Sequence, residues 1–402
     1  MRNRKPLVWL STFVMLVSMF AIVACTSGGP KQVEQPTPNE NGIITAEQWK
    51  DMHPDIYASY QQNSNNSTVS SYLTQYPFLV TIYDGTGFAK DYSEARGHVY
   101  TLQDIADTQR PHAAANCLTC KTPEMTALVN SQGVSIYSAD FVEIYSKVGE
   151  PVSCYNCHEN TGDQLVVTAG YLKDALGSDI SKVDPKMLSC AQCHNEYYFD
   201  PTTKATTLPW VGLNNMTPDA ILAYYNTIGF SDNTNSFSGA TMIKVQHPEF
   251  ETVMGIGSQV KSMGNFTCAS CHMGTATNAN GEEYISHYWV SPLKNEDLLK
   301  NVCSSCHANL AADVAVIQST TKARLVTIGE KLADLHMEIG KAAADGVKSE
   351  GELAELRSLI RDAQFYYDFC FVENSDGAHN SAMTKDLLDK SEDLIDQALA
   401  KL

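Results

Sequence analysis

The sequence predicts a mostly α-helical fold with little sheet. In the 402-residue sequence, no stretch as long as a strand alternates apolar and polar side chains. Toward the C-terminus, apolar residues instead recur at intervals of three and four, which places them on one side of a helix. The chain also contains 12 cysteines, ten of them in five C-x-x-C pairs. Groups bound at these pairs would form much of the core.

Four of the cysteine pairs identify the bound group, because a histidine follows each of them directly. A C-x-x-C-H run attaches a c-type haem through two thioether bonds, and its histidine coordinates the iron. Structural zinc is the competing use of paired cysteines, but zinc sites rarely place histidine directly after the second cysteine four times over. The haem-binding residues expected on this basis are Cys154, Cys157 and His158; Cys190, Cys193 and His194; Cys268, Cys271 and His272; and Cys303, Cys306 and His307.

The remaining pair, Cys117 and Cys120, is followed by Lys121 instead of histidine. A lysine must lose its proton to bind iron, so the metal and burial have to hold its pKa down. Such a ligand is costly unless it tunes the iron for chemistry. We therefore expect five covalently bound haem c groups, with the Lys121 haem as the catalytic one.

The N-terminus has the pattern of an export signal. Basic residues precede an apolar run from Leu7 to Ala24, so residues 1–24 are predicted to be a signal peptide. The run ends in a lipobox-like sequence before Cys25, whose two acyl chains would suffice for stable anchoring. An uncleaved membrane anchor is the alternative. Residues 25–45 then form a lipidated N-terminus and flexible tether, and the protein is expected at the outer face of the cytoplasmic membrane or in the periplasm.

Two regions follow the tether. Residues 46–308 are predicted to form a pentahaem catalytic domain, whose first helix begins at Ala46 after the capping-box pair Thr45 and Gln48. Residues 309–402 form a C-terminal helical region with two apolar seams and a last helix over about 384–402. These seams suit dimerisation through a partner helix, or packing within one chain. The seams comprise Leu325, Ile328, Leu332, Leu335 and Ile339, and then Leu353, Leu356, Ile360, Ala363, Tyr367 and Cys370.

Charge and ligand counts limit the function further. The net charge of −18 excludes a nucleic-acid partner. Of the 11 histidines, seven remain after the four in the C-x-x-C-H runs, which is enough to make most of the haems six-coordinate electron carriers. Catalysis on iron needs one position left open. Separately, Glu196, Gln246 and nearby backbone carbonyls offer the oxygen ligands that calcium prefers, although a plain pair of Glu196 with Lys244 is the alternative.

The motifs also occur in a recognisable order. The C-x-x-C-K site, the Arg-Gly-His run at 96–98, the Glu-Tyr-Tyr-Phe run at 196–199 and the Lys-x-Gln-His-Pro run at 244–248 resemble the ammonia-forming pentahaem cytochrome c nitrite reductases. The resemblance extends from about His53 to the C-terminal helices. It implies six-electron reduction of nitrite to ammonium at the Lys121 haem, fed by four further haems. It also implies a membrane quinol-oxidising cytochrome as electron donor and a homodimer.

The resemblance implies individual roles as well. Lys121 is the proximal ligand of the catalytic haem, and Arg96, Tyr197 and His247 line its open face. One calcium ion is held by Glu196 and Gln246, with Tyr197 and Lys244 contributing backbone carbonyls. The implied distal ligands are His287 for the second haem, His98 for the third and His379 for the fourth.

One segment departs from the family pattern. Relatives have Gly-Ile-His shortly before the fourth C-x-x-C run, and that histidine is the distal ligand of the fifth haem. Here the segment reads Gly255-Ile256-Gly257-Ser258. Met263 is the candidate to replace it, with Lys261 or a five-coordinate iron as alternatives; a methionine ligand would raise the reduction potential of that haem.

Two other functions remain open from the sequence. A reductase of the same build acting mainly on hydroxylamine or sulfite would use the same pocket. A multihaem electron-transfer protein without substrate chemistry would have no ligand-accessible iron, and the Lys121 site argues against it.

Overall fold

The computed structural model describes residues 34–112, 114–256 and 266–402. The chain divides into two compact units, Met1–Gln35 and Pro36–Leu402, and everything below concerns the second. The predicted signal peptide and Cys25 lie outside the described residues, as do Lys261 and Met263. No helix in the described part combines the length and apolarity needed to span a bilayer.

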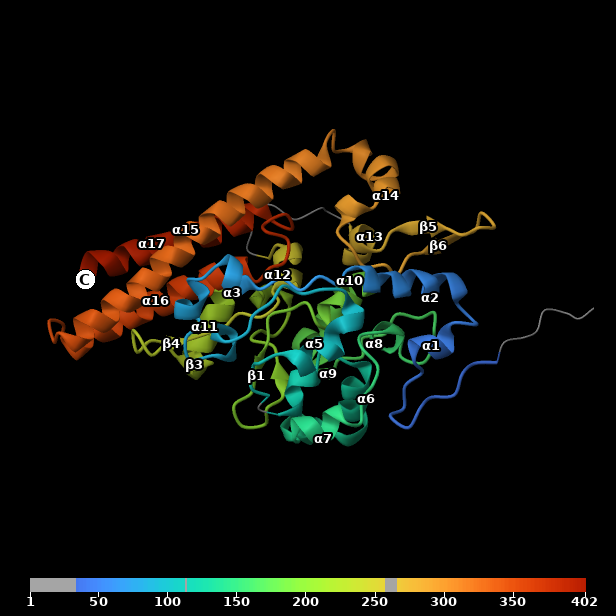
Figure 1. Cartoon of the computed structure of the whole chain (residues 1–402), viewed down its shortest axis with the longest axis horizontal. Helices are drawn as coiled ribbons and strands as arrows, with labels where there is room; N and C mark the ends of the chain where they lie inside the picture. The colour runs from blue at the N-terminus through green and yellow to red at the C-terminus, as the bar shows by residue number, and fades with distance from the viewer. Residues whose placement is uncertain (1–33, 113, 257–265) are drawn as a thin grey trace, which may run out of the picture. The chain divides into compact units, whose positions relative to one another are not determined.

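Helices dominate this unit (Figure 1). Those before the C-terminal region are short: α1 (Ala46–Trp49), α2 (Pro54–Gln61), α3 (Tyr72–Gln75), α4 (Leu79–Ile82), α5 (Thr101–Asp107), α6 (Pro123–Gln132), α7 (Phe141–Tyr145), α8 (Cys154–His158), α9 (Gly170–Leu176), α10 (Pro185–Ala191), α11 (Pro218–Ile228), α12 (Glu249–Met254), α13 (Cys268–His272) and α14 (Glu296–Asn301). The 3₁₀ helices are η1 (Gln62–Asn65), η2 (Gly87–Ala89), η3 (His98–Tyr100), η4 (Ala115–Leu118), η5 (Val134–Ser138), η6 (Gly177–Lys182), η7 (Leu213–Asn215), η8 (Pro292–Lys294) and η9 (Cys303–Ser305).

The strands of the described residues form only two-stranded antiparallel sheets. They pair β1 (Tyr198–Phe199) with β2 (Thr206–Thr207), β3 (Asn233–Thr234) with β4 (Thr241–Met242), and β5 (Thr275–Thr277) with β6 (Glu283–Ile285). The prediction of a mostly α-helical fold with little sheet is therefore confirmed.

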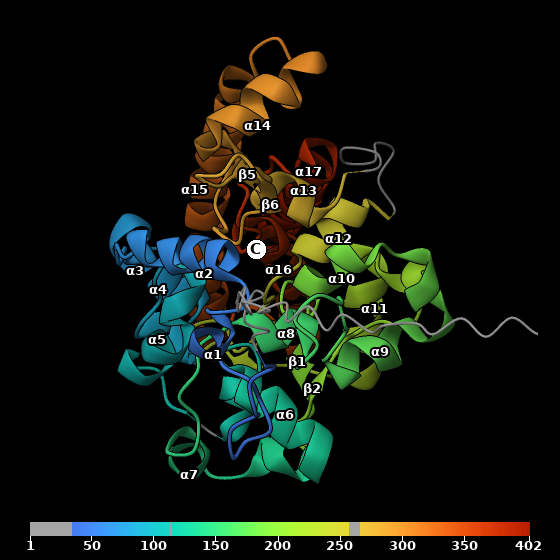
Figure 2. The same ribbon diagram turned by 90° about the vertical axis from the view of Figure 1, so that its right-hand side faces the viewer.

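Three long helices end the chain: α15 (Leu310–Ala344), α16 (Glu350–Phe371) and α17 (Ser381–Lys401). They lie side by side in both ribbon views (Figures 1 and 2). The predicted seams are buried in α15 and α16, and Ser349 caps α16 in the expected capping box with Glu352. The seams pack against helices of the same chain, which is the second of the two alternatives that the spacing allowed.

Two glycines let other segments approach α15 closely. A Cβ atom at Gly329 would lie 2.2 Å from the Phe78 ring, and one at Gly340 would lie 2.2 Å from the Phe237 carbonyl oxygen. Glycine lowers helix stability by about 1 kcal/mol relative to alanine, so its use here is explained by packing. The segments that carry Phe78 and Phe237 are thereby held tightly against α15.

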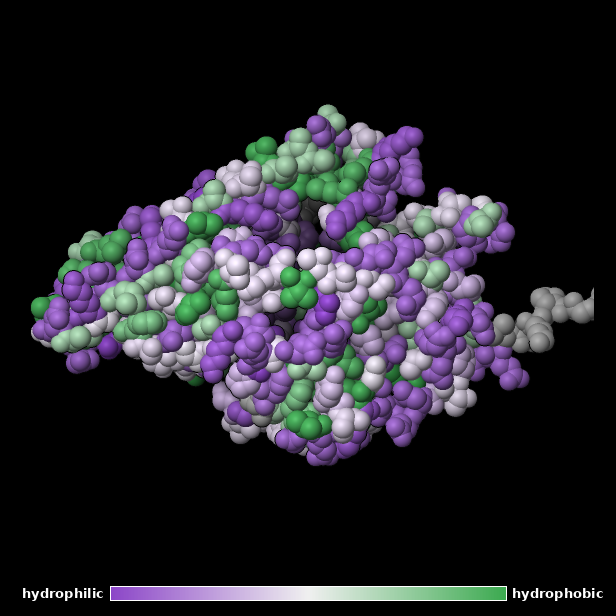
Figure 3. Space-filling model, viewed as in Figure 1, coloured by the Kyte–Doolittle hydropathy of each residue, from purple (hydrophilic) through white to green (hydrophobic). Residues whose placement is uncertain are grey.

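The largest apolar core joins these three helices to α4, α9, α10, α11 and α12. A smaller core surrounds the first cysteine pair and is built from α5, η4, α6, η5 and α7. The surface between them mixes polar and apolar residues on the face shown in Figure 3, where a hollow lies near α14 and the start of α15.

The ordered chain begins earlier than predicted. Helix α1 starts at Ala46 with the expected capping box of Thr45 and Gln48. However, Ile43 and Ile44 are fully buried, and the backbone N–H of Ile44 donates to Asn160 at 2.8 Å. The physical reason is the hydrophobic effect, because burying these two apolar side chains is more favourable than leaving them in water as part of a flexible tether.

Candidate active site

Two of the cysteine pairs lie within single turns of helix. Helix α8 begins at Cys154 behind a capping box formed by Ser153 and Asn156, and α13 begins at Cys268 behind one formed by Thr267 and Ser270. Residues three apart in a helical turn share a face, so both thiols of a pair point the same way. This is the arrangement that attachment to one macrocycle requires.

Among the described residues, imidazole rings lie near one another in four pairs; one joins His194 to His247 at 6.0 Å between ring centres, and the other three join a histidine of a C-x-x-C-H run to its implied distal ligand. The ring centres of His158 and His287 are 6.2 Å apart, those of His98 and His194 are 6.0 Å apart, and those of His272 and His379 are 5.9 Å apart. An imidazole nitrogen binds a transition metal at about 2 Å, so two rings on opposite sides of one metal ion have centres about 6 Å apart. The structure thus brings each implied distal histidine to its predicted partner.

In four of these six rings the Nδ1 nitrogen is held by the protein, which orients the other nitrogen toward the metal position. Most of the partners are backbone carbonyls, but His379 has a carboxylate. The Nδ1 distances are 3.0 Å for His158 to Gln164 O, 3.0 Å for His287 to Ile285 O, 2.9 Å for His272 to Val290 O and 2.5 Å for His379 to Glu373 Oε1.

The cysteine pairs also follow one another in space. Cys120 of the first pair lies close enough to Cys193 of the third for the two thiols to affect each other's pKa, and the same holds for Cys190 of the third and Cys268 of the fourth. Cys271 lies within electrostatic range of Cys303 in the fifth pair. Cys157 of the second pair contacts the carbonyl of Ser189, next to the third pair, at 3.7 Å. Groups attached at the first, third, fourth and fifth pairs would form a chain, with the second pair beside the third.

Lys121 lies at the end of the turn that carries Cys117 and Cys120. Its backbone carbonyl accepts the Thr101 hydroxyl at 2.8 Å, which fixes the turn against α5. Burial lowers the pKa of His247, and the nearby positive charges of His194 and Lys121 lower it further, against the opposing effect of Glu249. Lys121 therefore lies close enough to His247 to affect its pKa.

Tyr197 joins the same site. Burial raises the pKa of its phenol well above the usual range, and the thiols of Cys120 and Cys117 raise it further. The Arg110 guanidinium opposes these effects. Tyr197 therefore lies between the first cysteine pair and a cation that the sequence analysis did not select.

Arg96 lies elsewhere, which corrects the prediction that it lines this site. Its Nη2 is 2.6 Å from Asp104 Oδ1, and its Nη1 donates to the Ser67 carbonyl at 3.1 Å. Its guanidinium also covers the Tyr100 ring at 4.0 Å. The Arg96 guanidinium is therefore bound by these groups, and its role is to hold the segment before His98 in place.

Arg110 is the arginine near Tyr197. Its Nε donates to the Thr108 hydroxyl at 3.1 Å, and its guanidinium lies over the Phe88 ring. The sequence offered one signal for it, a position closer to the first cysteine pair than Arg96. The match of Arg96 to the Arg-Gly-His run concealed that signal.

A set of oxygen atoms surrounds Glu196 directly behind Tyr197. The Glu196 carboxylate is fully buried and accepts the Gln246 backbone N–H at 2.6 Å and the Tyr225 hydroxyl at 2.8 Å. The Gln246 amide nitrogen donates to the Lys244 carbonyl at 2.7 Å. The structure therefore brings together three of the four residues predicted to hold calcium, and Tyr197 adjoins them in sequence.

The Lys244 ammonium does not form the plain pair with Glu196 that the sequence left open. It lies 3.4 Å from Asp368 and faces the rings of Tyr83, Phe88 and Tyr92 at 4.8 to 5.5 Å. The Lys244 backbone carbonyl, in contrast, lies beside the Gln246 side chain.

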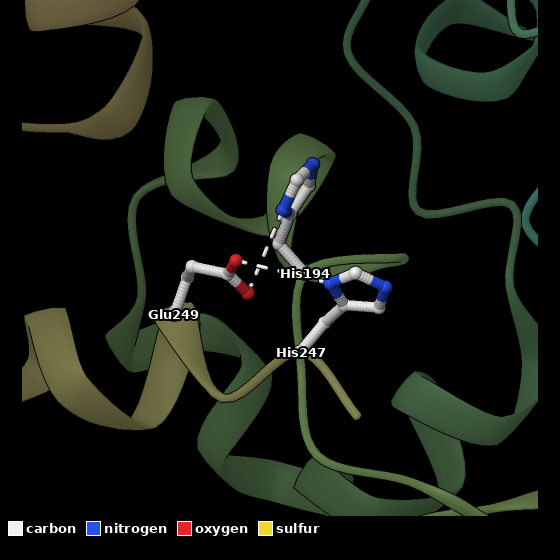
Figure 4. A group of neighbouring side chains, drawn as sticks. All are labelled: His194, His247 and Glu249. Carbon is white, nitrogen blue, oxygen red and sulfur yellow. Dashed lines mark ion pairs between the residues drawn. The ribbon is translucent and has the colours of Figure 1, made fainter. Parts of the chain in front are cut away.

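His247 also belongs to a cluster with His194 and Glu249 (Figure 4). The Glu249 carboxylate lies 3.6 Å from the Nδ1 of His194 and 3.8 Å from that of His247. Burial would raise the pKa of Glu249, but the two imidazoles hold it well below its usual range.

Comparison with known proteins agrees with this geometry. The family described as cytochrome c552 matches residues 45–402. The chain belongs to the cytochrome c552 family. A cytochrome c-552 from Aliarcobacter butzleri is 31% identical over 358 residues, covering 82% of this chain and 70% of that relative. The catalytic subunit of the cytochrome c nitrite reductase from Desulfovibrio desulfuricans ATCC 27774, described with two calcium sites, superposes with a TM-score of 0.79 at 26% identity, covering 90% of this chain and 86% of that one.

The residues of this cytochrome c552 family member fit the groups that the family implies. The facing imidazoles are spaced for iron, and a cavity of about 320 Å³ opens beside Cys303 and His307. The chain is therefore a multihaem c-type cytochrome and an oxidoreductase.

The Glu196 site also fits a cation. Burial raises the pKa of Glu196 well above its usual range, and that of the adjacent Glu251 to about 8. The buried Glu251 Oε2 has no hydrogen-bond partner. Two buried carboxyl groups this close are more stable with a divalent ion beside them.

Proposed function

We propose that this chain reduces nitrite to ammonium in a six-electron reaction at a haem c held by Cys117, Cys120 and Lys121, with four further haems c as electron carriers. The observation that carries the proposal is the set of side chains around the first cysteine pair. Tyr197 lies near both this cysteine pair and Arg110, and His247 lies near Lys121, a set of polar groups that a chain serving only electron transfer would not need. At the second, third and fourth sites a second histidine faces the first, and among the described residues no histidine is assigned as a distal ligand of the Lys121 site.

The haem at this site supplies an iron with one position for substrate and a route for electrons. The protein supplies the charge and the protons. Arg110 donates hydrogen bonds to the nitrite oxygens and stabilises negative charge as the N–O bonds break. His247, whose pKa is lowered by burial, acts by taking up a proton and passing it to the substrate. Tyr197 is a further donor, and its high pKa keeps the phenol protonated at neutral pH.

The positive pocket matters because the chain carries a net charge of −18. Long-range attraction does not bring an anion to such a protein, so binding depends on local cations. The chain of cysteine pairs supports rapid delivery of electrons from the third, fourth and fifth sites, which favours complete reduction over release of intermediates.

The remaining assignments complete the proposal. A calcium ion binds Glu196 and Gln246 with the carbonyls of Tyr197 and Lys244, directly behind the pocket. A membrane quinol-oxidising cytochrome donates the electrons. The protein is lipid-anchored at Cys25 on the outer face of the cytoplasmic membrane and forms a homodimer. Because the apolar seams of α15 and α16 are used within the chain, a dimer contact has to use other surfaces of these helices.

The test is the ammonium yield from nitrite, measured with haem-loaded protein and a reduced viologen dye. We expect near-stoichiometric ammonium without accumulated intermediates. Nitrite consumption without ammonium, or no consumption, would contradict the proposal, and hydroxylamine and sulfite would then be compared as substrates. Failure of cyanide to bind any of the haems would instead favour the electron-transfer function.

A further inference from the structure

One buried carboxylate, that of Glu249, lies between two imidazoles with different roles. One is His194, the proximal ligand expected for the third haem, and the other is His247 of the substrate pocket (Figure 4). The carboxylate oxygens lie 3.6 Å from the first Nδ1 and 3.8 Å from the second. Both separations are within about 4 Å, the range of an ion pair, so a small turn of either ring completes a hydrogen bond.

The surroundings hold Glu249 in this position. It is only 7% exposed and forms the first residue of α12, where its charge is favoured by the helix dipole. Asn374, from the loop between α16 and α17, donates to its Oε1 at 2.5 Å. The next residue, Phe250, donates its backbone N–H to the His194 carbonyl at 3.0 Å. The carboxylate is therefore fixed relative to the backbone of His194.

We propose that Glu249 is a shared positioning residue that orients both the third-haem ligand His194 and the substrate-pocket residue His247. The inference rests on the proposed function for the role of His247. An acceptor at Nδ1 fixes the proton there and leaves Nε2 as the outward nitrogen of each ring. The centres of the His194 and His98 rings are 6.0 Å apart, and in His247 Nε2 lies on the side of the ring away from Glu249 (Figure 4).

The shared carboxylate has an electronic consequence. The proximal rings at the second and fourth sites face backbone carbonyls, whereas His194 faces a full negative charge. A carboxylate at Nδ1 makes an imidazole a more basic ligand, which lowers the reduction potential of its iron. The third site adjoins the first through Cys193 and Cys120. The Glu249 carboxylate thus favours electron transfer from the third haem toward the pocket, and it also orients the His247 ring in that pocket.

Glu249→Gln tests the inference, with Glu251→Gln as the matched control. Glu251 lies on the same helix and is also buried, but it contacts Trp210 and the Glu196 backbone instead of an imidazole. The first readout is the reduction potential of the third haem, from a potentiometric titration followed by electron paramagnetic resonance. The second is the separation of kcat from KM for nitrite.

We expect Glu249→Gln to raise the third-haem potential and to lower kcat on the order of tenfold, with a smaller change in KM. Glu251→Gln should leave the third-haem potential unchanged. An unchanged potential in Glu249→Gln, an equal shift in both variants, or a shifted potential with unchanged kcat would each overturn the shared role. If Glu249→Gln loses haem, Glu249→Asp is the second variant. Its shorter side chain keeps the negative charge but moves it away from the imidazoles, so the third-haem potential should also rise, by less than expected for Glu249→Gln.

The third-haem potential is measured without substrate, so this test is independent of the proposed function. If the parent protein forms no ammonium, the proposed function fails, and cyanide affinity of the Lys121 haem replaces kcat as the second readout. A change in both the third-haem potential and that affinity would still support Glu249 as the shared residue.

Discussion

The Arg110 guanidinium lies over the ring of Phe88, with its central carbon 4.7 Å from the ring centre. This contact and the Thr108 hydroxyl hold the cation beside Tyr197. Arg110→Gln should therefore remove stabilisation of the developing charge on nitrite, and we expect kcat/KM to fall about 100-fold. Steady-state nitrite consumption with a reduced viologen measures it, after the haem content is shown to match the parent.

Arg96→Gln is the matched comparison, because Arg96 is bound by Asp104 and Ser67 instead. We expect it to cost no more than about 1 kcal/mol of stability and to leave turnover within about twofold of the parent. Equal losses of turnover in the two variants would show that the placement of Arg110 does not determine the chemistry.

His247→Asn should lose most nitrite turnover and keep its haems. Asparagine still donates a hydrogen bond, but it cannot deliver a proton as an imidazole does, and that transfer is worth about 100-fold or more. Haem content by absorbance and turnover by ammonium yield are the two measurements. Turnover equal to that of the parent would remove His247 from the mechanism.

Calcium should raise the thermal stability of the purified protein, because an ion bound only by the folded state stabilises it by mass action, about 3 kcal/mol at 100 times the dissociation constant. Glu196→Gln should abolish most of this gain, since it removes the one carboxylate of the predicted ligand set. Melting temperatures with chelator and with added calcium provide the comparison. Magnesium is the control, because it prefers smaller, more hydrated sites, and an equal effect of the two ions would count against the site.

His336 makes stability depend on pH at a site remote from the haem-binding motifs. Its ring is fully buried between Ser238 and Gln364, and burial lowers its pKa to about 4, despite opposing effects of Gln364 and Asp84. Below pH 6.5 the unfolded chain binds a proton that the folded chain does not. The free energy of unfolding should therefore fall by roughly 3 kcal/mol between pH 6.5 and pH 4.

Denaturant unfolding at a series of pH values tests this for the parent and for His336→Gln. Because other groups also titrate in this range, the difference between the two proteins is the relevant quantity. Between pH 6.5 and pH 4 the free energy of unfolding should fall more steeply in the parent than in His336→Gln, so the difference between the two proteins should change with pH. Parallel curves would mean that His336 is not the group responsible.

The elements that local rules determine were predictable from the sequence. The capping boxes at Thr45 and Ser349 and the buried seam of α15 follow from residue spacing alone. The choice between Arg96 and Arg110 does not, because it depends on which side chain finds a carboxylate nearby in the fold. Glu249 was missed for a related reason: its two imidazoles come from segments about 50 residues apart, and only tertiary packing brings them together.

Each pair of facing imidazoles joins residues on the order of 100 positions apart along the chain. A ligated metal between them would act as a cross-link, closing a loop as a disulfide does and reducing the entropy of the unfolded state. Three such loops overlap along the chain, because His98 faces His194, His158 faces His287 and His272 faces His379. Loss of one axial bond would therefore loosen segments distant from the iron, so ligand exchange and unfolding should be observed together.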